Sequence, residues 1–103
     1  MSDINKIKIG GFSYAVEYIK DLCDEDGKLD GRINNELALV QIEVAMNDQM
    51  KVQSIIHEAL HSIFFQIGRQ DLNKKEDLVD SLAFSIFQVL RDNPDFIKSI
   101  LEL

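Results

Sequence analysis

The sequence predicts an α+β fold in which an antiparallel sheet is followed by two long helices and a short final helix. Three observations support this order. Apolar residues alternate with period two up to about residue 44, they follow helical spacing from residue 48, and Asn93-Pro94 interrupts the helical part. A length of 103 residues, 46% of them apolar, suits a single domain with one core, which we expect to span residues 1–103.

The first part of the chain has the pattern of strands. Alternation in residues 6–9 resumes in residues 12–18 after Gly10-Gly11, which predicts a β-hairpin because both turn positions favour positive φ. The acidic stretch 21–31 has two glycines and indicates a loop. Residues Leu37–Val44 alternate again and predict a half-buried strand.

Two long helices are predicted from the second part of the chain. The first runs from about Asp48 to Ile67, with Asn47 or Asp48 as its cap and Gly68 at its end. Its apolar stripe centres on Val52, Ile56, Ala59 and Ile63. The second helix runs from about Lys74 to Asp92, and Pro94 suits the first turn of a short final helix.

Charge and composition exclude several classes of partner. The formal net charge is −7, so phosphate backbones and anionic lipids are repelled, and we expect neither a nucleic acid nor a membrane as partner. The sequence has no apolar run long enough for a membrane span and no apolar leader. Cys23 is the only cysteine, which favours a reducing, cytoplasmic location. The oligomeric state has no signature in the sequence.

The chemistry of the chain is concentrated in His57-Glu58-Ala59-Leu60-His61. Four residues along a helix return to nearly the same face, so both imidazoles can reach one metal ion. This spacing is typical of a zinc site, in which the ion makes a water molecule acidic and Glu58 acts as the general base. The sequence therefore predicts Zn²⁺ as cofactor, His57 and His61 as metal ligands and Glu58 as the catalytic residue.

A catalytic zinc site needs a third protein ligand, and the sequence has only two histidines. A carboxylate must therefore serve, and Glu76 and Asp80 lie four residues apart at the start of the second helix. Glu76 also fits a capping box with Asn73, in which its carboxylate bonds to the backbone of the cap. On spacing alone, Glu76 and Asp80 both stand as candidates for the third ligand.

The His57–His61 motif together with the segment Glu76–Ala83 resembles the zincin metallopeptidases that use a glutamate as third ligand. It is most similar to the small ImmA/IrrE-like proteins of phages and mobile elements, although Val79, Asp80 and Leu82 depart from that family's pattern. The resemblance implies a zincin-like fold with Glu76 as a metal ligand. Asp80 would orient a ligating histidine, with direct ligation as its alternative role, and Leu37–Val44 would be the edge strand along which the substrate lies.

We therefore expect a zinc metalloendopeptidase that hydrolyses a flexible segment of a regulatory protein. The alternative is a non-catalytic module that keeps a zinc site and regulates a partner by binding it. Zincins also need a donor for the oxyanion of the tetrahedral intermediate, and Tyr14 and Tyr18 are the only tyrosines. Because both fall in strand patterns, we expect them to be core residues.

Overall fold

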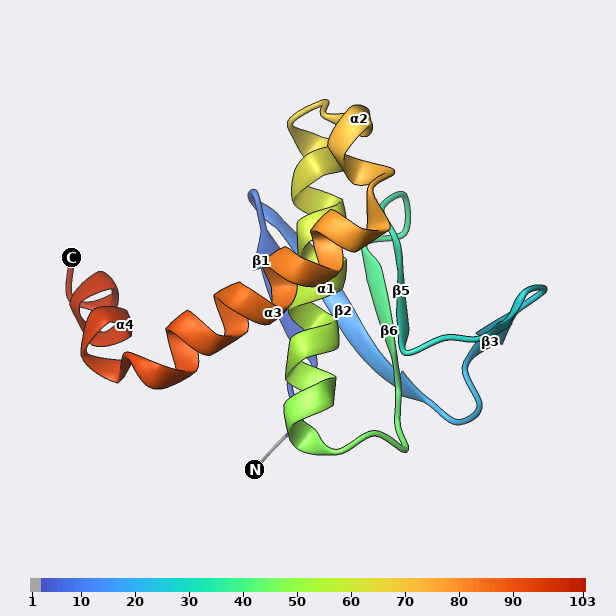
Figure 1. The fold of residues 1–103 in the computed structure, drawn as a ribbon, viewed down its shortest axis with the longest axis horizontal. Helices are drawn as coiled ribbons and strands as arrows, with labels where there is room; N and C mark the ends of the chain where they lie inside the picture. Colours follow the sequence, from blue (N-terminus) through green and yellow to red (C-terminus); the bar gives the residue numbers. More distant parts are fainter. Residues whose placement is uncertain (1–2) are drawn as a thin grey trace.

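The computed structural model describes residues 3–103 and has a mixed sheet, a small hairpin and four helices (Figure 1). The strands are β1 (Lys6–Ile9), β2 (Phe12–Ile19), β3 (Cys23–Asp24), β4 (Gly27–Lys28), β5 (Gly31–Asn34) and β6 (Leu39–Glu43). The helices are α1 (Asp48–Gln66), α2 (Gln70–Asn73), α3 (Glu76–Asp92) and α4 (Pro94–Leu101). The α+β class and the order of strands before helices are confirmed.

The four-stranded sheet has the order β1-β2-β6-β5 and is mixed rather than antiparallel. The predicted hairpin forms at Gly10-Gly11, where both glycines have positive φ. Strand β6, however, pairs in parallel with β2 and antiparallel with β5. The prediction that Leu37–Val44 is an edge strand is therefore wrong, because β6 lies inside the sheet and β5 forms that edge.

The acidic stretch 21–31, predicted to be a loop, contains the β3–β4 hairpin and the first residue of β5. Strand β5 has the sequence Gly-Arg-Ile-Asn, in which only Ile33 is apolar, so alternation could not reveal it. Its turn to β6 places Ala38 at a φ of 51°, and the Asn34 side chain accepts a hydrogen bond from the Leu37 amide. The turn is thus specified by local contacts that the period-two pattern does not contain.

Helix α1 packs along one face of the sheet and forms the main core. Asn47 caps α1, because its side chain accepts a hydrogen bond from the Met50 amide 2.8 Å away. Asn47 is one of the two residues that the sequence predicted as the cap. The core consists of alternate residues of the strands and one side of α1, namely Ile9, Tyr14, Val16, Val40, Ile42 and Ile55. The outer face of the sheet carries polar and charged residues, as expected for a sheet with helices on one face.

Helix α3 crosses α1 on the side away from the sheet (Figure 1). The contact is a second core made by Leu60 and Phe64 of α1 with Val79 and Ala83 of α3. The short helix α2, which the sequence did not predict, lies between them. The second long helix begins at Glu76 rather than at Lys74, and Lys75 is its cap without a side-chain hydrogen bond.

Helix α4 begins at Pro94, as predicted, and projects from the rest of the molecule (Figure 1). Among the described elements it contacts only α3. No helix within residues 3–103 combines the length and the apolar character that crossing a membrane requires. The chain thus has a sheet–helix–helix body and a projecting C-terminal helix.

The two tyrosines allow a matched test of the core. The Tyr14 hydroxyl is buried and bonds to Asn35 and Ser62, whereas the Tyr18 hydroxyl donates to the Ile4 carbonyl at an exposed position. Tyr14→Phe leaves buried polar groups short of a partner, so we expect it to lower the free energy of unfolding by about 1–3 kcal/mol. Tyr18→Phe should cost about 1 kcal/mol or less. Urea denaturation measures both, and equal losses would contradict the assignment.

Candidate metal centre

The structure brings His57, His61 and Glu76 together at one point between α1 and α3. The Nε2 atoms of the two imidazoles are 3.2 Å apart. The Glu76 carboxylate lies 3.3 Å from Nε2 of His57 and 2.9 Å from Nε2 of His61. Helices α1 and α3 thus bring together three ligand atoms of the kinds that zinc prefers.

A second set of partners orients both imidazoles. Nδ1 of His57 lies 2.8 Å from the Asp80 carboxylate, and Nδ1 of His61 lies 2.6 Å from Oδ1 of Asn73. Each Nδ1 therefore carries the proton and donates it, which leaves the Nε2 lone pair of each ring directed at the other ring and at Glu76. Partners of this kind hold metal-ligating histidines in the correct tautomer.

The donor set fits a zinc ion in both distance and charge. Ligand atoms at about 2.0–2.1 Å from a tetrahedral ion lie about 3.3 Å apart, close to the spacings among the three residues. Two imidazole Nε2 atoms and a carboxylate converge there, and a cation bound between them would have all three as ligands. The His57 and His61 side chains are only 17% and 14% exposed, whereas the Glu76 side chain is 64% exposed and leaves the position open to the solvent.

Glu58 lies beside this cluster and is itself buried. Its carboxylate is 3.9 Å from Nε2 of His57, which is beyond hydrogen-bond length, so it stands next to the three donors without joining them. Burial raises the pKa of the Glu58 carboxyl from 4.5 to about 7, and the carboxylates of Glu76 and Asp80 act in the same direction. His61 opposes the shift. A carboxyl group with this pKa can exchange protons near neutral pH.

An open cleft of about 550 Å³ contains these residues and is bounded by α1, α3 and the β3–β5 segment. Gly31, the first residue of β5, lies close to Glu58. A Cβ atom there would lie 3.4 Å from Cγ of Glu58 and 3.0 Å from Cδ1 of Ile42, so a side chain would press on both. The glycine lets the free edge of β5 lie beside Glu58 and the His57–His61–Glu76 cluster.

The sequence pointed to most of these residues and left two roles open for Glu76. Glu76 was a candidate both for a ligand and for a capping box with Asn73, and no such box forms. Asn73 bonds instead to His61, a role that the sequence did not reveal. The structure places Asp80 on the back of His57, away from the converging atoms, and Glu76 among them.

Neither tyrosine reaches the cleft. Tyr14 belongs to the main core and bonds to Ser62, and Tyr18 lies at the edge of that core and bonds to the Ile4 carbonyl. The expectation that both tyrosines are core residues agrees with these positions, although Tyr18 is only partly buried. The candidate site therefore contains two histidines, three carboxylates and one amide, but no phenol.

The buried carboxyl of Glu58 predicts a pH dependence of stability in chelator-treated protein. The folded chain keeps its proton up to about pH 7, whereas an unfolded chain loses it near 4.5. Between these values the folded state binds more protons, so its stability falls as the pH rises, by about 3 kcal/mol in all. Glu58→Gln should lack this fall.

Urea denaturation at several pH values between 4 and 8 measures this effect. Glu25→Gln, at an exposed position in the β3–β4 turn, is the matched control and should keep the wild-type slope. Parallel stability curves for the wild type and Glu58→Gln would show that Glu58 is not protonated in the folded chain.

Comparisons of the chain with protein-family models, with curated proteins and with solved structures give no match. The side chains from which a function can be inferred are therefore those that the cleft and its surroundings bring together, namely His57, Glu58, His61, Glu76, Asp80 and Asn73.

Proposed function

We propose that this protein is a zinc-dependent metallopeptidase with a reduced zincin-like fold. The observation that carries the proposal is the convergence of His57, His61 and Glu76 within hydrogen-bond distances of one another, next to a buried Glu58. A site that only binds a metal has no use for that fourth group. Burying an acid costs free energy, which a catalytic base would justify.

Each residue has a distinct part in the proposed reaction. His57, His61 and Glu76 would hold the ion, while Asp80 and Asn73 keep the two imidazoles in the Nδ1-protonated form. When bound, zinc supplies a Lewis acid that polarises a peptide carbonyl and makes water acidic near neutral pH. Glu58 would take a proton from the attacking water and pass it to the amine of the leaving peptide.

The shape of the cleft favours an extended, flexible segment as substrate. The outer edge of β5 pairs with no described strand and borders the cleft, so a peptide can add to it as a further strand. The sequence predicted that the substrate lies along Leu37–Val44. Because that segment lies inside the sheet, we assign this role to β5 instead. Because the cleft is open and shallow, a folded protein would have to present a flexible segment to it. We propose that the substrate is such a segment of a regulatory protein in the cell interior.

The first test concerns the metal. We expect one zinc per chain, with His61→Ala abolishing binding because two protein ligands rarely hold zinc against solvent. Glu76→Gln should weaken binding more than Asp80→Asn, which removes only an orienting contact and typically costs 10–100-fold. Competition with a chromogenic chelator gives the affinities.

Asp77→Asn is the matched control for the metal test, because Asp77 is exposed on the same helical turn as Glu76 but is not part of the cluster. It should leave the affinity unchanged. A larger loss for Asp80→Asn than for Glu76→Gln would reverse the roles of the two carboxylates.

The second test separates catalysis from metal binding. Glu58→Gln should retain zinc and the fold but lose cleavage by about 10²–10⁴-fold, because only the proton acceptor is removed. Zinc-loaded protein would be incubated with casein and with candidate repressor proteins, and the products identified by mass spectrometry. Equal products from the wild type and Glu58→Gln would assign the cleavage to a contaminating protease.

The alternative function is a zinc-containing binding module that regulates a partner without cleaving it. The openness of the cleft favours it, since no second lobe of the described chain closes over the site. Tight binding of zinc and of a partner by both the wild type and Glu58→Gln, with no products from either, would establish this alternative.

A further inference from the structure

One end of the cleft has a chemistry that the candidate metal centre does not use. Helix α1 follows β6 after a short loop and runs back along the sheet, and β5 is antiparallel to β6, so α1 and β5 run in the same direction (Figure 1). Gly31 lies beside Glu58, in the middle of α1. The residues just before it, Leu29 and Asp30, therefore lie towards the first turn of α1, where Met50 also lines the cleft.

We call this end of the cleft the aspartate subsite, which consists of Asp24, Leu29, Asp30 and Met50. Its two apolar side chains are available for contact, since Leu29 is only partly buried and Met50 is 45% exposed. Its two carboxylates are exposed, and neither forms an ion pair within residues 3–103. An apolar wall beside two unpaired carboxylates matches a side chain with a hydrocarbon stem and a cationic end, as in lysine and arginine.

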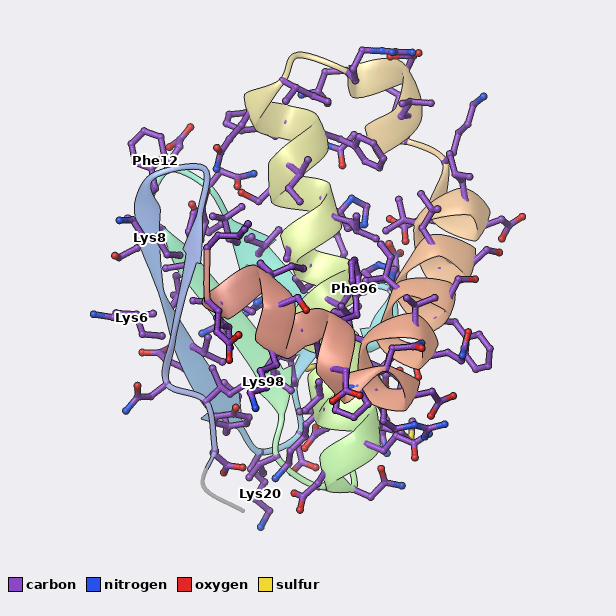
Figure 2. The ribbon with its side chains drawn as sticks, turned by 90° about the vertical axis from the view of Figure 1, so that its left-hand side faces the viewer. Lys6, Lys8, Phe12, Lys20, Phe96 and Lys98 are labelled. Atoms are coloured by element: carbon purple, nitrogen blue, oxygen red, sulfur yellow. The ribbon has the colours of Figure 1, made fainter. Side chains whose placement is uncertain are left out.

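The protein places almost no positive charge in this cleft. Arg32 is the only lysine or arginine among the residues that line it. The Arg32 guanidinium is held on the outer face of the sheet, where its Nε donates a 2.6 Å hydrogen bond to Oε1 of Gln41. The lysines labelled in Figure 2 lie elsewhere, with Lys6 and Lys8 pointing away from α1 on the outer side of the sheet. A cationic side chain at this end of the cleft therefore meets carboxylates without a competing positive charge.

A separate observation indicates that a ligand enters the cleft. The Glu58 side chain is only 9% exposed and lines the cleft, yet no hydrogen bond from the described residues reaches its carboxylate. A buried acid without a partner is costly unless a bound molecule makes use of it. The outer edge of β5 likewise pairs with no described strand. The acid and the unpaired strand edge both lie next to the aspartate subsite.

We propose that the aspartate subsite selects peptide segments that carry a lysine or an arginine near the bond to be cut. This inference rests on the proposed function, because it takes β5 as the strand to which the peptide adds. Side chains of an added strand alternate between the two faces of the sheet, so every second one points towards α1. When one such residue lies beside Gly31, the next lies beside Leu29, and its cationic end meets Asp24 and Asp30. The cation thus stands about two residues from the scissile bond.

Binding of three matched peptides tests the proposal without relying on cleavage. The peptides are flexible, fluorescently labelled and uncharged except at one central residue, which is lysine, norleucine or glutamate. Norleucine has nearly the stem of lysine but no charge, so it measures the apolar contact alone. The Glu58→Gln chain, in buffer containing zinc, should bind the lysine peptide about 5-fold more tightly than the norleucine peptide, because two exposed ion pairs form. The glutamate peptide should bind most weakly, and added salt should reduce the lysine preference in fluorescence anisotropy.

A double variant, Asp24→Asn with Asp30→Asn in the same Glu58→Gln chain, should bring the lysine and norleucine affinities within about twofold. Asparagine at position 24 can still accept the hydrogen bond from the Asp26 amide, so the β3–β4 turn should form normally. Glu25→Gln with Asp77→Asn is the matched control, because it changes the net charge equally at residues that do not line the cleft. This control should keep the full lysine preference.

Equal binding of the lysine and norleucine peptides, binding of none of the three, or an equal loss in the control chain would overturn the aspartate subsite. The peptidase is tested separately by incubating the same peptides with the zinc-loaded wild type. Lysine-selective binding without cleavage would reject the peptidase and keep the subsite. Cleavage of all three peptides at equal rates would keep the peptidase and reject the subsite.

Discussion

The contact between α1 and α3 determines where the chemical groups of this protein lie. Ala83 allows the helices to approach closely, and Val79, which is fully buried, fixes their register against Leu60 and Phe64. In this register the first two turns of α3 face the middle of α1. Glu76 then meets both imidazoles and Asp80 meets the back of one. A larger residue at position 83 would separate the helices and move the carboxylates away from the histidines.

Gly31 and the open cleft make the burial of Glu58 possible at an acceptable cost. A carboxyl group placed between a helix and a sheet would normally be replaced by an apolar residue, because the ionised form loses its hydration. Here the helix leaves one side open to the cleft, and Gly31 lets strand β5 pass without a side chain over Glu58. The acid is thus shielded enough to hold its proton near neutral pH, yet still reaches the position where chemistry would occur.

The sequence predicted best those features of the structure that depend on residues close together along the chain. The α1 cap at Asn47, the hairpin at Gly10-Gly11 and the start of α4 at Pro94 are local, and so is the spacing of His57 and His61. The parallel pairing of β2 with β6 joins segments more than twenty residues apart, and no local pattern encodes it. Strand β5 was missed for the same reason, since its stability comes from its partner rather than from its own residues.

The capping box that does not form at Asn73 shows how a local rule can be overridden at a site. Asn73 and Glu76 have the spacing of a capping box, and in an isolated helix each would satisfy the other's end. In the folded chain Asn73 bonds to His61 instead, and Glu76 contacts both His61 and His57. Helix α3 consequently starts without a side-chain cap, and its first turn is held by the histidines of α1. The stability of that turn and the geometry of the metal centre are therefore one property, and a change in either alters the other.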